Sequence, residues 1–464
     1  MLTYNYENRD VPLYEYVYKC IKNDILCGNL KQGEKLPSKR TFAKNNGVST
    51  ITIQNAYEQL ISEGYVYTIP KKGYYVADIE NMVVKTNVES VKFDIRIPKQ
   101  KESYRIDLSS NKTNPEYFPF SVWAKLCRET IASRSNELME VTPTGGAYEL
   151  RSAIAKHLKS FRGMSVDPNQ IVIGAGTEYL YGLLIQLLGS DKNYCTENPG
   201  YKKLVQIYEK HNIKCYFANM DEKGISVESL RRANADVAHI SPTHHFPTGI
   251  SMPANRRYEV LSWANESDGR YVIEDDYDSE FRPSGKPIPP MFSIDRAEKV
   301  VYMNTFSKSL TPTIRISYMI LPPHLINRFY KELSFYSCTV SNFEQYTLSE
   351  FINQGFFEKH INRMRLYYSK QRKRLITNIE NSKLNEVCEI IENDSGLHFL
   401  LRLKTDKPDN EITDMLKEKG IQIRALSEYY LAPARKQEHL FIMNYSDIDM
   451  EKIEEAIEEI TGIL

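Results

Sequence analysis

The sequence lacks both a long apolar run and an excess of charge of either sign. No apolar stretch approaches the ~20 residues that a membrane helix needs, and residues 1–10 are polar, without the apolar core of a secretory signal. The 60 Lys and Arg residues equal the 60 Asp and Glu residues, so net charge favours no particular class of partner. We therefore expect a cytoplasmic protein that makes no contact with a membrane.

Paired cysteines and nucleotide-binding glycine motifs are missing as well. The seven cysteines are an odd number without a Cys-x-x-Cys pair, which argues against a disulfide framework or a zinc site. Neither Gly-x-Gly-x-x-Gly nor a Walker lysine motif occurs, which disfavours a nucleotide site. The chain has 464 residues, 41% of them hydrophobic, and this length predicts two or three globular domains.

The first 80 residues follow the element order of a winged helix-turn-helix. Three helices are expected. The first ends at Gly28, the second is capped by Ser38 and ends near Gly47, and the third is capped by Ser49 and ends at Gly64. Two β-rich runs follow, 65–69 and 74–76, joined by Pro70-Lys71-Lys72-Gly73. This pattern predicts a hairpin with a basic tip after the third helix.

The start of the third helix is the part that a helix-turn-helix directs into the major groove of DNA. Thr50 and Thr52 can reach base edges there, and Ser49 can reach a phosphate. Lys39 and Arg40 begin the second helix, where a phosphate also meets the positive end of the helix dipole. Residues 1–78 carry only ten Lys and Arg against eight Asp and Glu, so charge alone also allows a protein-interaction module.

Short motifs over residues 11–77 resemble the GntR-type winged helix-turn-helix. They are Pro12-Leu13-Tyr14, Gly28-x-Leu30, Leu36-Pro37-Ser38-x-Arg40, Gly47-Val48-Ser49, Ala56-Tyr57-x-x-Leu60 and Glu63-Gly64-Tyr65. The resemblance implies that Arg40, Thr50, Thr52 and the wing residues Lys71 and Lys72 contact a double-stranded DNA operator. Members of that family usually have an arginine or a similar residue near the place of Thr50, so their base preference does not carry over.

The domain plan that follows has three parts. Residues 1–78 are the expected DNA-binding domain, 79–104 an extended linker without helical periodicity, and 105–464 a large domain. In the large domain strand-like runs alternate with helical ones. This alternation predicts an α/β fold with a largely parallel sheet.

Two strand ends of the large domain carry candidates for binding an anion and a planar ring. Gly174-Ala175-Gly176-Thr177 leaves backbone N–H groups free at the start of a helix, although such turns often bind nothing. Tyr201 follows another strand, where its ring could stack on a cofactor or simply pack. The adjacent His244 and His245 have no carboxylate at a suitable spacing, so we expect no metal site there.

Two further strand ends carry an acidic cluster and a lysine. Within residues 274–278, Asp275 could pair with a protonated pyridine nitrogen and Tyr277 with a ring oxygen, whereas a magnesium site is the alternative. The other acids of this cluster are expected at the surface. Lys308, between Ser307 and Ser309, could form a Schiff base, with the hydroxyls and Arg315 holding a phosphate. A solvated loop lysine is the ordinary alternative.

Taken together, these motifs resemble a fold-type I aminotransferase over residues 105–464. They are Asn198-Pro199-Gly200-Tyr201, Phe246-Pro247-Thr248-Gly249, Asp275-x-Tyr277, Ser307-Lys308 with Arg315, and Gly396-Leu397-His398. With a GntR-type head, the whole chain resembles the MocR/GabR subfamily of bacterial transcription regulators. The resemblance implies a head-to-tail homodimer that binds pyridoxal 5'-phosphate in a Schiff base with Lys308. The residues it implies around the cofactor are Asp275 at the ring nitrogen, Tyr277 at the ring oxygen, Tyr201 over the ring, and Gly176, Thr177, Ser307 and Arg315 at the phosphate.

Several positions depart from the aminotransferase pattern. Phe246 replaces an asparagine that helps to hold the cofactor oxygen, Val141 replaces a tyrosine donated by the partner subunit, and residues 313–317 lack the usual glycines. The late strand at 440–445 lacks the arginine that binds a substrate carboxylate, for which Arg424 is the nearest candidate substitute. Lys203 stands where GABA-sensing relatives have a second arginine, and a lysine lacks the bidentate grip of an arginine.

These features favour a DNA-binding transcription regulator over an enzyme. We expect its large domain to bind pyridoxal phosphate through Lys308 and to sense the cofactor or an amine or amino-acid effector, with Lys203 and Arg424 as candidate effector contacts. The alternative is a catalytically active aminotransferase with an accessory DNA-binding head, in which Lys308 is the evident base. A third possibility is a purely structural cofactor that reports vitamin B6 status.

Overall fold

The computed structural model describes residues 4, 11–79, 95, 97, 104–110, 114–282, 288–391, 396–432, 436–449 and 451–464. Contacts divide the chain into two compact units, Met1–Gln100 and Lys101–Leu464. Most of the expected linker, 79–104, and most of residues 1–10 lie outside the described residues.

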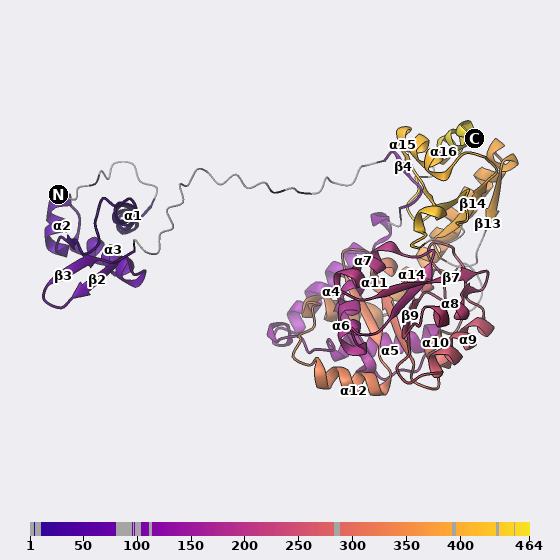
Figure 1. Ribbon diagram of the computed structural model, residues 1–464, viewed down its shortest axis with the longest axis horizontal. Coiled ribbons are helices and arrows are strands. Elements are labelled where there is room, and N and C mark those ends of the chain that lie inside the picture. The colour runs from indigo at the N-terminus through magenta and orange to yellow at the C-terminus, as the bar shows by residue number, and fades with distance from the viewer. Residues whose placement is uncertain are drawn as a thin grey trace. The chain divides into compact units, whose positions relative to one another are not determined.

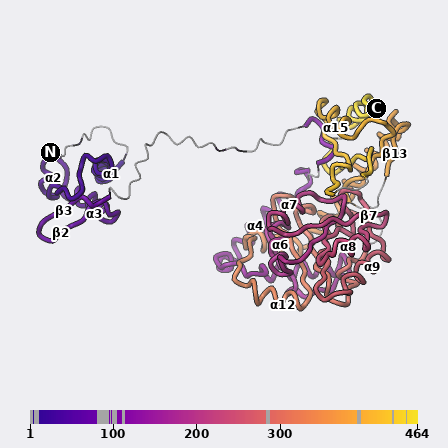
Figure 2. The backbone as a smooth tube through the Cα atoms, in the orientation of Figure 1, coloured from indigo at the N-terminus to yellow at the C-terminus, as the bar shows by residue number. Residues whose placement is uncertain are grey.

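Among its described residues, the first unit contains three helices and a small antiparallel sheet, and Figure 2 traces their backbone. Its elements are α1 (Leu13–Leu26), β1 (Lys35–Leu36), α2 (Lys39–Asn46), α3 (Thr50–Ser62), β2 (Val66–Ile69) and β3 (Gly73–Val76), with the sheet order β1-β3-β2. Ser38 and Ser49 cap α2 and α3 through their side-chain oxygens, as predicted. Val17, Ile53 and Leu60 form part of the buried core between the helices. The predicted winged helix-turn-helix is confirmed, with β1 as an additional strand.

The second unit is built around an eight-stranded mixed sheet (Figure 1). In sheet order the strands are β5 (Ile171–Ala175), β12 (Ile316–Ile320), β11 (Val300–Thr305), β10 (Tyr271–Asp275), β9 (Val237–Ile240), β6 (Tyr194–Asn198), β7 (Cys215–Asp221) and β8 (Gly224–Ile225). The strands β11, β10, β9, β6 and β7 run parallel, while β12 and β8 are antiparallel to their neighbours. The predicted α/β fold is therefore confirmed.

Helices cover both faces of this sheet. Successive residues of a strand point to opposite faces and are therefore buried against different helices. The helices and short 3-10 turns of the body are η1 (Pro115–Tyr117), α4 (Phe120–Ser133), η2 (Glu137–Met139), α5 (Tyr148–Arg162), η3 (Pro168–Gln170), α6 (Thr177–Leu188), α7 (Lys202–Lys210), α8 (Val227–Arg232), α9 (Ala254–Asn265), η4 (Ser279–Phe281), α10 (Met291–Ile294), α11 (Phe306–Ser309), α12 (Pro323–Glu332), α13 (Asn342–Asn353) and α14 (Phe356–Glu380). Tyr302 belongs to a cluster with α5 and α14, whereas Val301 belongs to a cluster with α6 and α12.

A smaller antiparallel sheet forms the C-terminal part of this unit (Figure 1). Its strands, in order, are β13 (Cys388–Ile391), β14 (His398–Leu403), β17 (Leu440–Asn444) and β16 (Arg424–Ala425). Around it lie η5 (Lys383–Glu386), α15 (Asp409–Glu418), η6 (Leu426–Tyr429) and α16 (Ile453–Ile463), and β15 (Ile421–Gln422) pairs in parallel with β4 (Ile106–Asp107). The start of the large unit is thereby tied to its C-terminal part.

Candidate functional site

Lys308 lies just beyond the carboxyl end of β11, as the sequence predicts. The short helix α11 follows the strand directly, and Thr305 caps it by accepting a hydrogen bond from the Ser307 N–H at 3.1 Å. Burial lowers the pKa of Lys308 below its ordinary value, although the carboxylate of Asp278 acts to raise it. A larger fraction of this amine is therefore uncharged, and hence nucleophilic, than of a solvated lysine.

Asp275 ends β10, the strand that pairs with β11. One carboxylate oxygen, Oδ2, accepts a hydrogen bond of 2.7 Å from the Tyr181 hydroxyl and lies 3.5 Å from His239 Nε2. The other oxygen, Oδ1, is buried and has no hydrogen-bond partner among the described residues. A buried carboxylate oxygen without a donor is costly, so this atom fits a ligand that brings a protonated nitrogen.

Tyr277 lies next to a buried histidine–carboxylate pair. His244 Nδ1 is 2.7 Å from Asp278 Oδ2 and 3.2 Å from the Tyr277 hydroxyl oxygen. Burial, followed by the charges of Asp278 and Asp275, raises the pKa of Tyr277 well above its ordinary value. The phenol is therefore neutral. The single Nδ1 hydrogen of His244 faces the nearer Asp278 carboxylate, so the Tyr277 hydroxyl hydrogen can be donated to a ligand oxygen.

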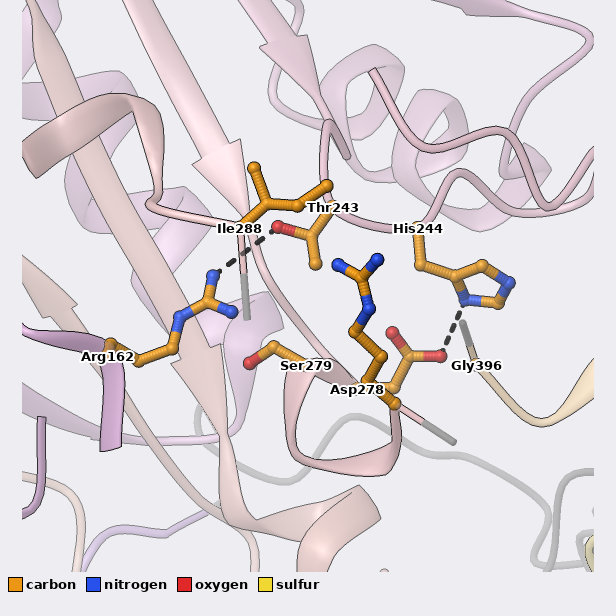
Figure 3. Close-up of a pocket in the computed structure, with 8 residues that line it drawn as sticks. Arg162, Thr243, His244, Asp278, Ser279, Ile288 and Gly396 are labelled. Atoms are coloured by element: carbon orange, nitrogen blue, oxygen red, sulfur yellow. Dashed lines mark hydrogen bonds and ion pairs between the residues drawn. The ribbon is translucent and has the colours of Figure 1, made fainter. Parts of the chain in front are cut away.

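Behind His244 lies a small cavity lined by Arg162, Thr243, His244, Asp278, Ser279, Arg282, Ile288 and Gly396 (Figure 3). Its volume of about 10 Å³ is room for about one water molecule. Gly396 closes it with a φ of +78°, and a Cβ there would lie 1.7 Å from His244 Cε1. The glycine of the Gly396-Leu397-His398 motif thus allows the backbone to approach the histidine that supports Tyr277.

The prediction that the remaining acids of residues 274–278 are at the surface is wrong. Glu274 is fully buried and accepts hydrogen bonds of 2.9 Å from the backbone N–H groups of Met291 and Phe292. Asp276 is also buried and pairs with Arg162 at 2.7 Å. The reason is that β10 is a central strand covered on both faces, so side chains on either side of it become buried.

The anion cradle at the end of β5 contains a guanidinium as well as backbone N–H groups. Gly176 has a φ of +90° and precedes α6, and a Cβ there would lie 2.2 Å from Arg315 Nη2. Thr177 is the first residue of α6, and the buried Ser307 hydroxyl has no hydrogen-bond partner among the described residues. A helix N-terminus with a guanidinium over it and an unpartnered hydroxyl suits a phosphate.

Arg315 and Lys203 both pair with Glu178, the second residue of α6. Partial burial acts to raise the pKa of Glu178, but the hydrogen bonds from Lys203 and Arg315 outweigh it and lower this pKa below its ordinary value. Arg424, in β16, donates to Glu428 over 2.7 Å. The two candidate effector contacts, Lys203 and Arg424, therefore already have carboxylate partners.

Tyr201 immediately precedes α7, and its ring is half exposed. The ring meets that of Phe246 edge-on, with centroids 6.4 Å apart, and Phe246 in turn packs against Tyr429 at 5.2 Å. Phe246 thus presents an apolar edge to Tyr201, at the position where the aminotransferase resemblance implies an asparagine. The Gly200 N–H donates to the Tyr429 carbonyl at 3.0 Å, which brings η6 and nearby Arg424 to the Tyr201 side of the site.

In the first unit, the residues expected to contact DNA are mostly exposed. Arg40, Ser49 and Thr50 lie at the starts of α2 and α3, and Lys71 and Lys72 form the wing tip, where Lys71 has a φ of +63°. The Ser49 hydroxyl is 2.8 Å from that of Thr52, so these two side chains also hold the helix cap. Their contacts with DNA stay a prediction.

The structure adds residues that the sequence reading overlooked. The sequence indicates His244 only as a candidate metal ligand, whereas in the structure it contacts both Tyr277 and Asp278. Glu178 directly follows Thr177, and its charge beside a proposed anion cradle was the available signal. Ile51, between Thr50 and Thr52, is 71% exposed, which is a high value for an apolar residue at the start of a recognition helix.

The described ranges contain neither a metal-ligand cluster nor a membrane-spanning helix. There, no group of three or more His, Cys, Asp and Glu side chains is arranged to hold a metal ion. None of the helices described here combines the length and the apolar character that crossing a membrane requires.

Comparison with known proteins assigns both parts of the chain. Residues 13–76 match the gntR family of bacterial regulatory proteins, and residues 105–460 match the class I and II aminotransferases. A kynurenine aminotransferase from Pyrococcus horikoshii superposes with a TM-score of 0.66 at 25% identity, over 77% of this chain and 91% of that one. The body of the large unit thus has the aminotransferase fold.

Two relatives share the full two-part arrangement. The uncharacterized HTH-type transcriptional regulator YdeL of Bacillus subtilis is 35% identical over 95% of each chain. The probable rhizopine catabolism regulatory protein MocR of Rhizobium meliloti is 28% identical over 97% of this chain and 93% of its own. The chain therefore belongs to the MocR family of HTH-type transcriptional regulators, in which a GntR-type winged helix-turn-helix is fused to an aminotransferase-like domain.

Proposed function

We propose that this regulator binds pyridoxal phosphate through Lys308 and changes its binding to a DNA operator when the cofactor or an amine effector occupies the large domain. The observation that carries the proposal is the unpartnered, buried Asp275 Oδ1 at the end of β10, next to the strand β11 that leads to Lys308 and its lowered pKa. A ligand without a hydrogen-bond donor at this place, such as an unprotonated pyridine ring, would leave that oxygen unsatisfied. A protonated pyridine ring would satisfy it.

The residues present fit each part of the cofactor. Asp275 would hold the ring nitrogen and Tyr277 the ring oxygen, with Tyr201 beside the ring. Gly176, Thr177, Ser307 and Arg315 would hold the phosphate. When bound, pyridoxal phosphate supplies an electrophilic carbon that accepts an amine and a ring that draws electrons from it.

The chain's own residues favour detection of an amine over repeated turnover. Lys308 would supply the nucleophilic amine toward the electrophilic carbon, because its lowered pKa keeps part of it neutral. Orienting a substrate for turnover needs a grip on its acid group, and Lys203 and Arg424 are paired with carboxylates instead. Occupancy would then shift an existing equilibrium between arrangements of the DNA-binding and large domains.

A dimer is part of this proposal, and an exposed apolar patch supports it. Met139 and Val141 are 86% and 79% exposed, and Phe343 is 46% exposed. Asn342 joins their segments by donating to the carbonyls of Glu137 and Glu140 at 3.0 and 2.9 Å. Such neighbouring apolar residues at a surface suit a subunit interface, which sedimentation of the full chain would detect.

Lys308→Ala tests the proposal directly. Wild type should show the visible absorbance of lysine-bound pyridoxal phosphate. Reduction with borohydride should attach the cofactor permanently to Lys308, and peptide mass spectrometry would identify the modified residue. Lys308→Ala should lose both signals and keep its basal DNA affinity, whereas Lys331→Ala, an exposed lysine on α12, should keep all three.

The proposal fails if wild type does not bind the cofactor or shows no sequence-selective DNA binding at moderate salt. Multiple-turnover production of a keto acid from an amine would instead favour the aminotransferase alternative.

A further inference from the structure

The candidate cations for an effector's acid group have carboxylate partners within the chain. Lys203 pairs with Glu178, and Arg424 pairs with Glu428. The strand β17, where aminotransferases carry the carboxylate-binding arginine, reads Leu440-Phe441-Ile442-Met443-Asn444. An incoming acid group would therefore have to displace a carboxylate that is already in place.

Glu178 is the more consequential of the two carboxylates because it also contacts Arg315. Without cofactor, Lys203, Arg315 and Glu178 together have a formal excess of one positive charge. The phosphate of pyridoxal phosphate brings close to two negative charges and takes Arg315 at the start of α6. Glu178 then keeps Lys203 as its partner, and the whole group becomes net negative.

An incoming acid group could exchange with Glu178 as the partner of Lys203, but this exchange does not remove the repulsion between the two acid groups. An exposed ion pair contributes only about 0–1 kcal/mol, so an acid could in principle replace Glu178 at Lys203. The displaced carboxylate, however, stays attached to α6, two residues after Gly176. Its charge remains beside the phosphate and the newcomer, and at such short range the solvent around this half-exposed group screens the repulsion only in part.

Resting on the proposed function, we propose that the effector is an amine without an acid group, such as an amino alcohol or a diamine. Glu178 is the residue that determines this choice, because it neutralises Lys203 and adds a negative charge beside the cofactor phosphate. Amino acids are then the disfavoured class.

Three ligands of equal chain length test the inference on the full-length protein saturated with pyridoxal phosphate. They are 4-amino-1-butanol, 1,4-diaminobutane and 4-aminobutanoate, which differ in the group at the far end. Binding is followed by the change in visible absorbance and, independently, by the shift in melting temperature. The alcohol and the diamine should reach half-saturation at concentrations at least about tenfold lower than the acid, the size of one modest charge interaction.

Glu178→Gln should bring the acid to within about twofold of the alcohol, because a neutral side chain frees Lys203 and removes the repulsion. Glu209→Gln, an exposed position on α7, makes the same change in net charge and should leave the wild-type order unchanged. Loss of cofactor binding by wild type would refute the proposed function. A wild type that binds the cofactor yet prefers the acid, or a Glu178→Gln variant with an unchanged preference, would overturn this inference alone.

Discussion

The two halves of the candidate site differ in how far their polar groups are already satisfied. On the cofactor side, Asp275 Oδ1 and the Ser307 hydroxyl are buried without partners among the described residues. On the effector side, Lys203 and Arg424 are exposed and paired with carboxylates. The first half is organised to receive a defined polar ligand, whereas the second is largely self-neutralised. If the proposed function holds, the first half would select the cofactor strongly, and the second would accept only a restricted class of effectors.

Disturbing the support of Tyr277 should have the largest effect. Gly396→Ala would place a methyl group against the His244 ring at a φ of +78°, so both a clash and backbone strain act there. We expect the free energy of unfolding to fall by about 3 kcal/mol. The measurement is the unfolding transition of the large domain in urea. Gly355→Ala is the matched control, because its φ of +75° is similar and nothing lies within 4 Å of the added atom. Equal losses in the two variants would contradict the packing argument.

Removing the charge opposite the ring nitrogen should have the next largest effect. Asp275→Asn keeps the shape of the side chain but weakens its hydrogen bond to a protonated nitrogen, at a cost of about 2 kcal/mol or about thirtyfold in affinity. Equilibrium titration with pyridoxal phosphate measures this change. Asp268→Asn, at an exposed position after α9, should bind as wild type does. An unchanged affinity in Asp275→Asn would remove the main support for the ring orientation.

A smaller effect, of opposite sign, is expected at the boundary between the halves. Glu178→Gln leaves Arg315 free for a phosphate, so pyridoxal phosphate should bind about tenfold more tightly. Pyridoxal, which lacks the phosphate, should change less than about twofold. The depressed pKa of Glu178 also predicts a pH dependence. As pH falls through that lowered pKa, Glu178 becomes protonated and the advantage of the variant over wild type should disappear. A similar gain for both ligands would show that Glu178 does not act on the phosphate.

The order of elements in both domains was predictable because local signals agreed with it. Ser49 caps α3, and Gly47 ends α2 in a left-handed conformation. The apolar run before Lys308 forms β11, as expected. Acids that follow an apolar strand look exposed in sequence, however, and Asp276 and Asp278 proved to be buried. Burial depends on what packs over a strand, and the elements that cover β10 come from distant parts of the chain.

The sequence by itself determined the family, the two folds and the candidate cofactor residues, because motif spacing and helix caps are local properties. Only the tertiary structure decided which charges neutralise one another. Glu178 meets Lys203 across 25 residues and Arg315 across 137, and His244 meets Asp278 across 34. Such pairs depend on how strands order themselves within the sheet, and no short motif records that order. The sequence indicates Lys203 only as a candidate effector contact, and its ion pair with Glu178 changes what that lysine is free to bind.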